Sequence, residues 1–312
     1  MRQVVADRER EDGEGTFGDR VAGLEPDVVI DLVCFTLDSA TALVERLRGE
    51  VGHLVHCGSV WRHGPADKLP ISESTGAPPV GEYGFQKDRI ARMLKEETAA
   101  GGLVTTSLHP GHIVGPGRHP IGPLGSLDPA VWYTLSAGQS LKVPGSGVEL
   151  MHHVHADDVA QPFERAVEQR DAAAGRGCGR GLHPRGAHRA ERARVRPYRG
   201  RLVRSDRVAG AGDLGGVPQN PAPEHAEASW EHLHRSQCLT IKTARTLLGY
   251  APRYEPEAAV LESVRRLIDH GELKPPVRSA SDPTRAARPG RRPGAPPGPR
   301  SPGPRRPRSP PR

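Results

Sequence analysis

The sequence predicts an α/β fold in which a parallel sheet carries helices on both faces. Residues 27–35 form a nearly continuous apolar run, which is typical of a strand buried on both faces of a parallel sheet. Runs of this kind alternate with helical patterns as far as about residue 174. Because strands that alternate with helices form right-handed βαβ units, this alternation indicates a parallel sheet.

The first elements follow one another closely along the chain. Residues 2–7 are expected to form an edge strand ahead of the main sheet. After the strand at 27–35, Asp38 or Ser39 can cap a helix whose apolar residues share one face, and Gly49 can end it. This pair of elements is therefore the first predicted strand and helix of the sheet.

Two further strands flank a second helix. Residues 53–59 are expected to form a short buried strand that ends in small residues, and 61–80 a loop rich in Pro, Gly and Ser. A helical pattern begins near Tyr83 and ends before Gly101. Residues 103–108 then form another predicted strand.

Composition and charge divide the chain unevenly. Only 35% of the 312 residues are hydrophobic and 4% are aromatic, which is little for a chain packed throughout. Residues 277–312 hold ten Arg and one Asp, and residues 176–207 hold eleven Arg and two acidic residues. Each of these two segments therefore carries a net charge of about +9. The whole chain carries +7, so the remaining residues together carry about −11. The part expected to fold is acidic, so we do not expect it to bind nucleic acid through a basic surface.

These patterns divide the chain into four parts. Residues 1–174 hold the predicted sheet, and residues 219–276 return to helical periodicity. Residues 175–218 show neither helical nor strand periodicity and are expected to be disordered. Residues 277–312, rich in Arg, Pro, Gly, Ser and Ala, are predicted to be a disordered tail.

Several classes of site and location are disfavoured. The four cysteines show no paired metal spacing and no secreted framework, so we expect reduced thiols in a cytoplasmic protein. The first residues lack the apolar core of a signal peptide, and no apolar run reaches membrane-spanning length. His152, His153 and His155 have no carboxylate at a matching helical spacing, which favours structural roles over a metal site.

Ser59, Tyr83 and Lys87 form a candidate proton-transfer site. A free phenol titrates near pH 10, so it is a poor base at neutral pH unless its anion is stabilised. If Tyr83 opens a helix, Lys87 lies on the same face four residues later, and its ammonium favours the phenolate. Ser59 would orient a substrate oxygen. A Tyr and a Lys at this spacing also occur by chance, so the surrounding segments decide the interpretation.

With these segments, residues 4–170 resemble the extended short-chain dehydrogenase/reductase family, the NAD-dependent epimerase/dehydratase group. The matching pieces occur in the family's order: the strand that ends at Ser59, the Tyr83-x-x-x-Lys87 pair, residues 109–117 and residues 151–160. His109-Pro-Gly-His-Ile-Val-Gly-Pro-Gly is similar to the family's Arg-Pro-x-x-x-x-Gly-Pro-Gly. Residues 230–273 resemble its C-terminal substrate-side end, best at 241–252.

The resemblance implies a fold, a cofactor and roles for named residues. The fold would be a Rossmann-like parallel sheet with helices on both faces, incomplete at the N-terminus, plus a small C-terminal substrate-side region. The cofactor would be NAD or NADP. Tyr83 would transfer the substrate proton, Lys87 would lower the phenol pKa and bind the nicotinamide ribose, and Ser59 would hold the reacting oxygen. The remaining residues implied in cofactor binding are Asp7, Val33, Cys34, Phe35, His109, Pro110 and Gly111.

The chain departs from the family at two places. The family opens with a strand, a Gly-rich turn and a helix that holds the pyrophosphate. Here Gly13-Glu-Gly-Thr-Phe-Gly18 follows a charged run instead of a strand, so we interpret it as a surface loop. We therefore expect a truncation of roughly fifty to sixty residues, for instance from a misplaced start codon. We also expect residues 175–218 and the tail after Pro276 to be frameshifted, which translation of the neighbouring frames of the coding DNA tests.

The residues after Ser59 narrow the reaction. Dehydratases of the family carry an Asp-Glu pair there, whereas this chain has Val60 and Trp61, so an epimerase or a reductase is expected. The resemblance implies a small-molecule substrate such as a sugar nucleotide, and a homodimer is the assembly to test. Two other hypotheses stand beside the enzyme: an inactive remnant without the phosphate loop, and a nucleic-acid binder that uses the Arg-rich segments. The Arg-rich segments hold one aromatic residue, Tyr198, so they could not stack on bases along a strand. Salt-sensitive contact with phosphates would be their remaining mode of binding.

Overall fold

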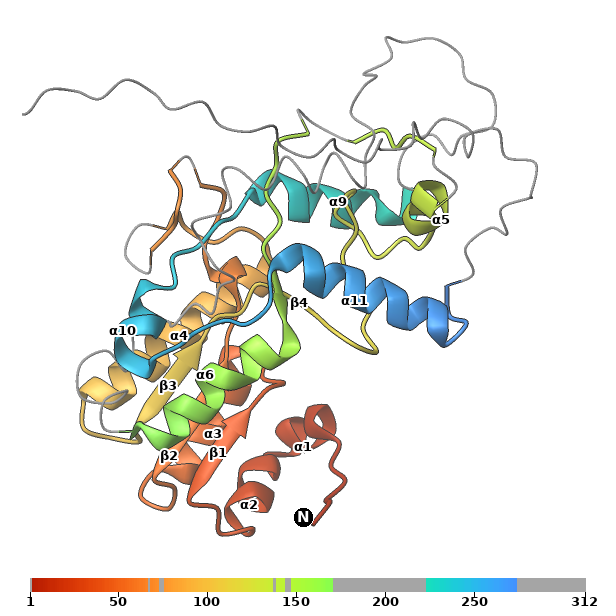
Figure 1. The fold of residues 1–312 in the computed structure, drawn as a ribbon. Coiled ribbons are helices and arrows are strands. Elements are labelled where there is room, and N and C mark those ends of the chain that lie inside the picture. The colour runs from red at the N-terminus through yellow and green to blue at the C-terminus, as the bar shows by residue number, and fades with distance from the viewer. Residues whose placement is uncertain are drawn as a thin grey trace, which may run out of the picture. The chain divides into compact units, whose positions relative to one another are not determined.

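The structure is a computed structural model that describes residues 2–66, 68–72, 76–136, 139–143, 147–170 and 223–273 (Figure 1). The segments 175–218 and 277–312, both predicted to be disordered, lie outside the described residues. The helices are α1 (Arg8–Glu14), α2 (Phe17–Ala22), α3 (Leu37–Leu47), η1 (Val60–Arg62), α4 (Glu82–Ala99), α5 (Ala130–Ser136), α6 (Ala156–Glu168), α9 (Pro223–Arg235), α10 (Lys242–Leu248) and α11 (Pro256–Asp269). The strands are β1 (Val28–Asp31), β2 (His53–Cys57), β3 (Thr105–Leu108), β4 (His112–Val114) and β5 (His153–His155).

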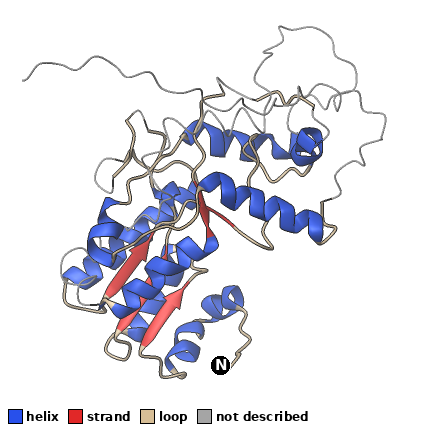
Figure 2. Ribbon diagram, viewed as in Figure 1, coloured by secondary structure: helices blue, strands red, loops and turns tan. Residues whose placement is uncertain are grey.

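The main sheet has three parallel strands in the order β1-β2-β3. Val29 pairs with Leu54, and Val55 pairs with Thr106. The parallel strands and the helices between them confirm the predicted α/β class (Figure 2). Parallel strands end at the same edge of a sheet, so the residues that follow β1, β2 and β3 are brought together there.

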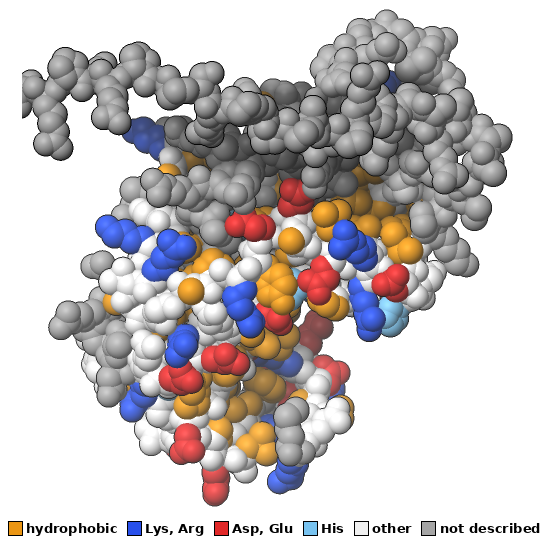
Figure 3. All heavy atoms as spheres, viewed as in Figure 1, with side chains coloured by type: hydrophobic (Ala, Val, Ile, Leu, Met, Phe, Trp, Pro, Cys, Tyr) orange, Lys and Arg blue, Asp and Glu red, His pale blue; other side chains and the backbone are white. Residues whose placement is uncertain are grey.

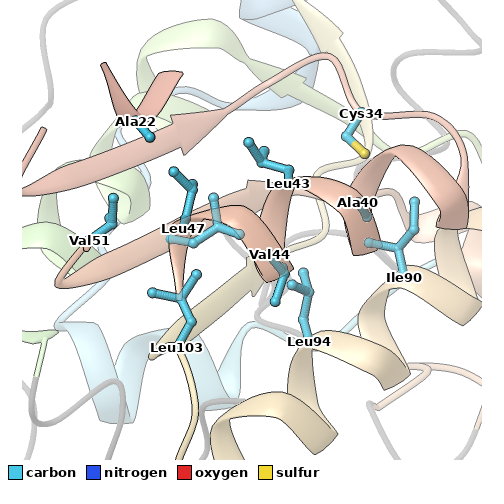
Figure 4. Packing of buried hydrophobic residues seen from close by; sticks show 11 residues of the cluster. Ala22, Cys34, Ala40, Leu43, Val44, Leu47, Val51, Ile90, Leu94 and Leu103 are labelled. Carbon is cyan, nitrogen blue, oxygen red and sulfur yellow. The ribbon is translucent and has the colours of Figure 1, made fainter. Parts of the chain in front are cut away.

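Both faces of this sheet are covered, because neighbouring residues of a strand point to opposite sides. Leu54 of β2 packs in a cluster with residues of α3 and α4, and Figure 4 shows Val44 of α3 beside Leu94 of α4 in this cluster. The next residue, Val55, packs with Phe163 of α6 and Leu248 of α10 on the other face. In Figure 1, α6 accordingly lies in front of the strands.

The predicted strand at 27–35 is shorter than expected. It ends at Asp31, and the residues that follow form a bend. We expected burial on both faces, but Ile30, Leu32, Val33 and Phe35 are between 48% and 58% exposed. The reason is that β1 is the outer strand of the described sheet. It has β2 as a neighbour along one edge, and no described strand lies along its other edge.

Two other local predictions are corrected. Residues 2–7 lie in no strand, because no described neighbour pairs with them. The helix at 37–47 is capped by Thr36, whose hydroxyl accepts from the backbone N–H of Ser39, and not by Asp38 or Ser39. Thr36 sits in extended backbone just ahead of the first helical turn, which is the conformation that a capping residue needs.

Gly13, Gly15 and Gly18 belong to a helical hairpin. Gly13 lies inside α1, Gly15 ends α1 with a left-handed backbone (φ 71°), and Gly18 lies in α2. None of them follows a strand, so the motif does not have the strand-turn-helix context that pyrophosphate binding requires.

A second parallel sheet has two strands, β4 and β5. Residues 112–114 form β4, which pairs with β5. The hydroxyl of Ser263 in α11 accepts from the N–H of Gly115 at 2.7 Å and donates to its carbonyl at 3.0 Å. Residues of the C-terminal region therefore pack directly on β4.

The described surface is mixed in charge. On the face in Figure 3, Lys and Arg side chains are interspersed with Asp and Glu. Within the described ranges, no helix combines the length and apolar composition needed to cross a bilayer.

Candidate active site

Tyr83 lies in the first turn of α4, at the strand-end edge of the sheet. Gly81 precedes the helix with φ 76°, a backbone conformation that favours glycine. The Tyr83 ring lies edge-on to Trp61, with 5.8 Å between centroids, and 6.4 Å from the ring of Phe35. Tyr83 is 40% exposed, so one side of the phenol remains open to a substrate.

Lys87 lies one helical turn later and is almost fully buried, at 1% exposure. Its Nζ donates to the carbonyl of Cys34 at 2.7 Å and to the carbonyl of Cys57 at 2.9 Å. It also lies 5.1 Å from the ring centroid of Phe35 and 5.7 Å from that of Tyr83. The ammonium thus ties α4 to the chain beyond β1 and to the end of β2.

Ser59 follows β2 and is buried. Its side chain is hydrogen-bonded to the Tyr83 phenol, and its Oγ also accepts from the N–H of Trp61 at 3.2 Å. The structure therefore brings Ser59, Tyr83 and Lys87 together, two from α4 and one from the end of a neighbouring strand.

Burial decides the protonation of this group. Burial raises the pKa of Tyr83 above its ordinary value, and the hydrogen bond with Ser59 only partly opposes it. Burial also lowers the pKa of Lys87. We expected Lys87 to lower the phenol pKa, but burial raises it, and the Lys87 ammonium is directed at two backbone carbonyls. Tyr83 is protonated at neutral pH.

The predicted cofactor residues lie at different depths. Val33 and Phe35 are exposed, at 55% and 54%, whereas Cys34 between them is fully buried and its Sγ contacts the carbonyl of Thr36. Asp7 is exposed and caps α1 by accepting from the N–H of Arg10. Asp7 therefore has a local structural partner, while Val33 and Phe35 are exposed apolar residues and the Phe35 ring lies beside Tyr83.

His109, Pro110 and Gly111 follow β3. Nδ1 of the buried His109 accepts from the N–H of Ser59 at 3.2 Å, and the Pro110 carbonyl accepts from the N–H of Val60 at 3.2 Å. A side chain at Gly111 would come within 2.3 Å of the His152 carbonyl. These residues fix the backbone around Ser59.

A group of histidines adjoins the site. The sequence did not indicate that these residues belong to it. The rings of His112 and His232 lie 5.0 Å apart, and those of His112 and His153 lie 5.6 Å apart. His232 also lies 4.8 Å from Trp61. Burial lowers the pKa of His153 to about 4 and that of His112 well below its usual range. These imidazoles are neutral at pH 7 and form a polar-aromatic wall next to Trp61.

Asp158 orients the backbone in this region. The buried carboxylate of Asp158 accepts from the N–H of Arg253 at 2.8 Å and from that of Tyr254 at 3.0 Å. Asp157 is more exposed and accepts from the Tyr254 hydroxyl at 3.1 Å. The described part of the chain holds no group of three or more His, Cys, Asp or Glu arranged to bind a metal ion.

Comparison with known proteins gives a family match and a relative. The model of a family described as the NAD dependent epimerase/dehydratase family matches residues 34–177. A curated relative, the 2'-dehydrokanamycin reductase of Streptomyces kanamyceticus, is 30% identical over 139 residues. This stretch is 44% of the present chain and 39% of the relative, so the chain spans less than half of the relative's length.

Solved structures share the fold. An epimerase from Methanothermobacter thermautotrophicus superposes with a TM-score of 0.60 at 17% identity, over 86% of this chain and 79% of that chain. A UDP-glucose 4-epimerase from Thermotoga maritima, solved with UDP-glucose, gives a TM-score of 0.57 at 16% identity, over 83% of each chain. A dTDP-glucose 4,6-dehydratase double mutant from Streptomyces venezuelae, solved with NAD, gives 0.52 at 17% identity, over 87% of this chain and 73% of that chain.

Proposed function

Because residues 34–177 match the model of the NAD-dependent epimerase/dehydratase family, we propose that Ser59, Tyr83 and Lys87 form an NAD(P)-dependent oxidoreductase or epimerase site. The observation that carries the proposal is the convergence of the three side chains at the strand-end edge of a parallel sheet, where open α/β folds bind ligands. Sites of this kind need a proton donor or acceptor, a group that orients the substrate oxygen, and a fixed cation.

The residues present fit the reactive half of a nicotinamide cofactor. Val33 and Phe35 are exposed apolar side chains, and the Phe35 ring lies beside Tyr83. An ammonium has three N–H donors, and Lys87 directs two of them at carbonyls within the described residues, so one can bind a ribose hydroxyl. When bound, the cofactor supplies the ring that accepts or returns a hydride.

Each residue has a separate task in this mechanism. Ser59 donates to the reacting oxygen of the substrate and holds it at the Tyr83 hydroxyl. Tyr83 gives its proton to that oxygen during reduction, or takes the proton during oxidation. Burial raises the pKa of the phenol, so Tyr83 holds a proton that it can give to the substrate oxygen in the reductive direction.

We propose a sugar nucleotide or a similar hydroxylated small molecule as the substrate. Two of the solved structures described above support this class: one contains UDP-glucose, and the other is a dTDP-glucose 4,6-dehydratase. Purified protein should therefore oxidise NADH or NADPH in the presence of a keto-sugar nucleotide, as followed by absorbance.

Tyr83→Phe tests the proposal. Loss of the proton donor should lower kcat by about a hundredfold or more, while cofactor affinity changes little. Tyr254→Phe is the matched control, because its hydroxyl contacts Asp157 and its ring stacks on His155, residues outside the proposed site. A Tyr83→Phe variant that keeps wild-type kcat overturns the assignment. Wild-type protein that binds neither NADH nor NADPH at millimolar concentration would instead identify an inactive member of the family.

A further inference from the structure

Trp61 links Tyr83 to the C-terminal part of the chain. The Tyr83 ring packs against the indole, with 5.8 Å between the ring centroids and an angle of 82° between the ring planes. On another side, the guanidinium of Arg235 lies over the indole at 3.9 Å from the centroid. Aromatic pairs and cation–π contacts of this kind restrain the orientation of the rings that they join.

Arg235 ends α9 and is 1% exposed. Its Nη2 donates at 2.9 Å to the carbonyl of Val80, immediately before the turn that starts α4, and its Nη1 donates to the carbonyl of Glu231. The same side chain therefore contacts the indole beside Tyr83 and the backbone from which the Tyr83 helix begins.

Gln237 binds the backbone of the turn that follows Ser59. Its buried Nε2 donates to the carbonyl of His63 at 2.5 Å and lies 3.3 Å from that of Val60. These carbonyls belong to the η1 turn that follows Ser59. At Gly84, a Cβ would come within 2.6 Å of the Trp61 carbonyl, so α4 and η1 are in direct contact.

We propose that Arg235 is a positioning residue that acts through Trp61 to hold the Tyr83 phenol against Ser59. The inference rests on the proposed function, because it assigns a purpose to the position of Tyr83. The physical basis is that a planar, charged fork can stack on the indole and bind a carbonyl at once, which the ammonium of a lysine cannot do.

Arg235→Lys and Trp61→Phe test the proposal, separately and together. Each single change should lower kcat about tenfold with little change in KM, because a reacting group that is displaced slightly loses rate without loss of binding. If Arg235 acts through Trp61, the double variant should be no worse than the worse single variant. Additive losses would overturn the proposal. Trp230→Phe is the matched control, since Trp230 lies on the same helix, is 67% exposed and stacks on His234.

A second measurement needs no turnover. Titration of tyrosine absorbance, with the Tyr83→Phe profile subtracted, gives the pKa of Tyr83. Arg235→Lys should lower this pKa toward the ordinary value, because a loosened Trp61 lets more water reach the partly exposed phenol. If the wild type proves inactive on every substrate and this shift occurs, the proposed function fails while the positioning role stands. If the pKa and kcat both stay at wild-type values in a folded Arg235→Lys variant, the positioning role is wrong.

Discussion

Replacing Lys87 by methionine probes how α4 is attached to the sheet. The change removes two hydrogen bonds, to the carbonyls of Cys34 and Cys57, from a side chain that is 1% exposed. Each carbonyl left without a partner costs roughly 1–3 kcal/mol. Removal of the buried charge offsets part of this loss of stability, because burial already disfavours the charged form of Lys87. We expect a net loss of about 3 kcal/mol in the free energy of unfolding.

Urea unfolding followed by circular dichroism measures this loss. Lys95→Met is the matched control, because Lys95 lies on the same helix and is exposed, so its free energy of unfolding should change by about 0.5 kcal/mol or less. Equal unfolding free energies for the two variants would refute the reasoning, since the two carbonyl contacts would then contribute nothing.

The remaining predictions concern the start of α4 and the buried histidines. Gly84→Ala should destabilise the fold by about 1–3 kcal/mol, because its Cβ meets the Trp61 carbonyl. Gly13→Ala in α1 meets nothing within 4 Å and should gain about 0.5–1 kcal/mol; similar urea midpoints for both would contradict this. Stability should be constant above about pH 6.5 and fall between about pH 6.5 and about pH 4, because burial lowers the pKa of His53 and His153 to about 4, so only the unfolded chain binds protons there. The loss is on the order of 3 kcal/mol per histidine, and a melting temperature unchanged from about pH 7 to about pH 5 would contradict it.

Features that depend on local pattern were predictable from the sequence. The apolar residues of β2 and the helical pattern after Tyr83 specify a strand and a helix without reference to distant residues. Their connection by a βαβ rule then places the end of β2 next to the start of α4. The meeting of Ser59 with Tyr83 and Lys87 follows from these local features and from the family's motif.

Features that depend on distant partners were not predictable. The stack of Arg235 on Trp61 joins residues that no local period relates. The exposure of Leu32 depends on whether another strand lies beside β1, which the apolar run itself does not reveal. The strand at His112–Val114 has only three residues, too short for a period-two pattern to be detected.

Calorimetric titration of the purified chain with NADH and NADPH is the decisive measurement for the proposed site. If Val33, Phe35 and Lys87 bind the nicotinamide half, the wild type and Tyr83→Phe should bind one of the two cofactors at micromolar concentration, and Lys87→Met should bind it more weakly. Absence of binding by the wild type at millimolar concentration of either cofactor would contradict an NAD(P)-dependent site in this chain.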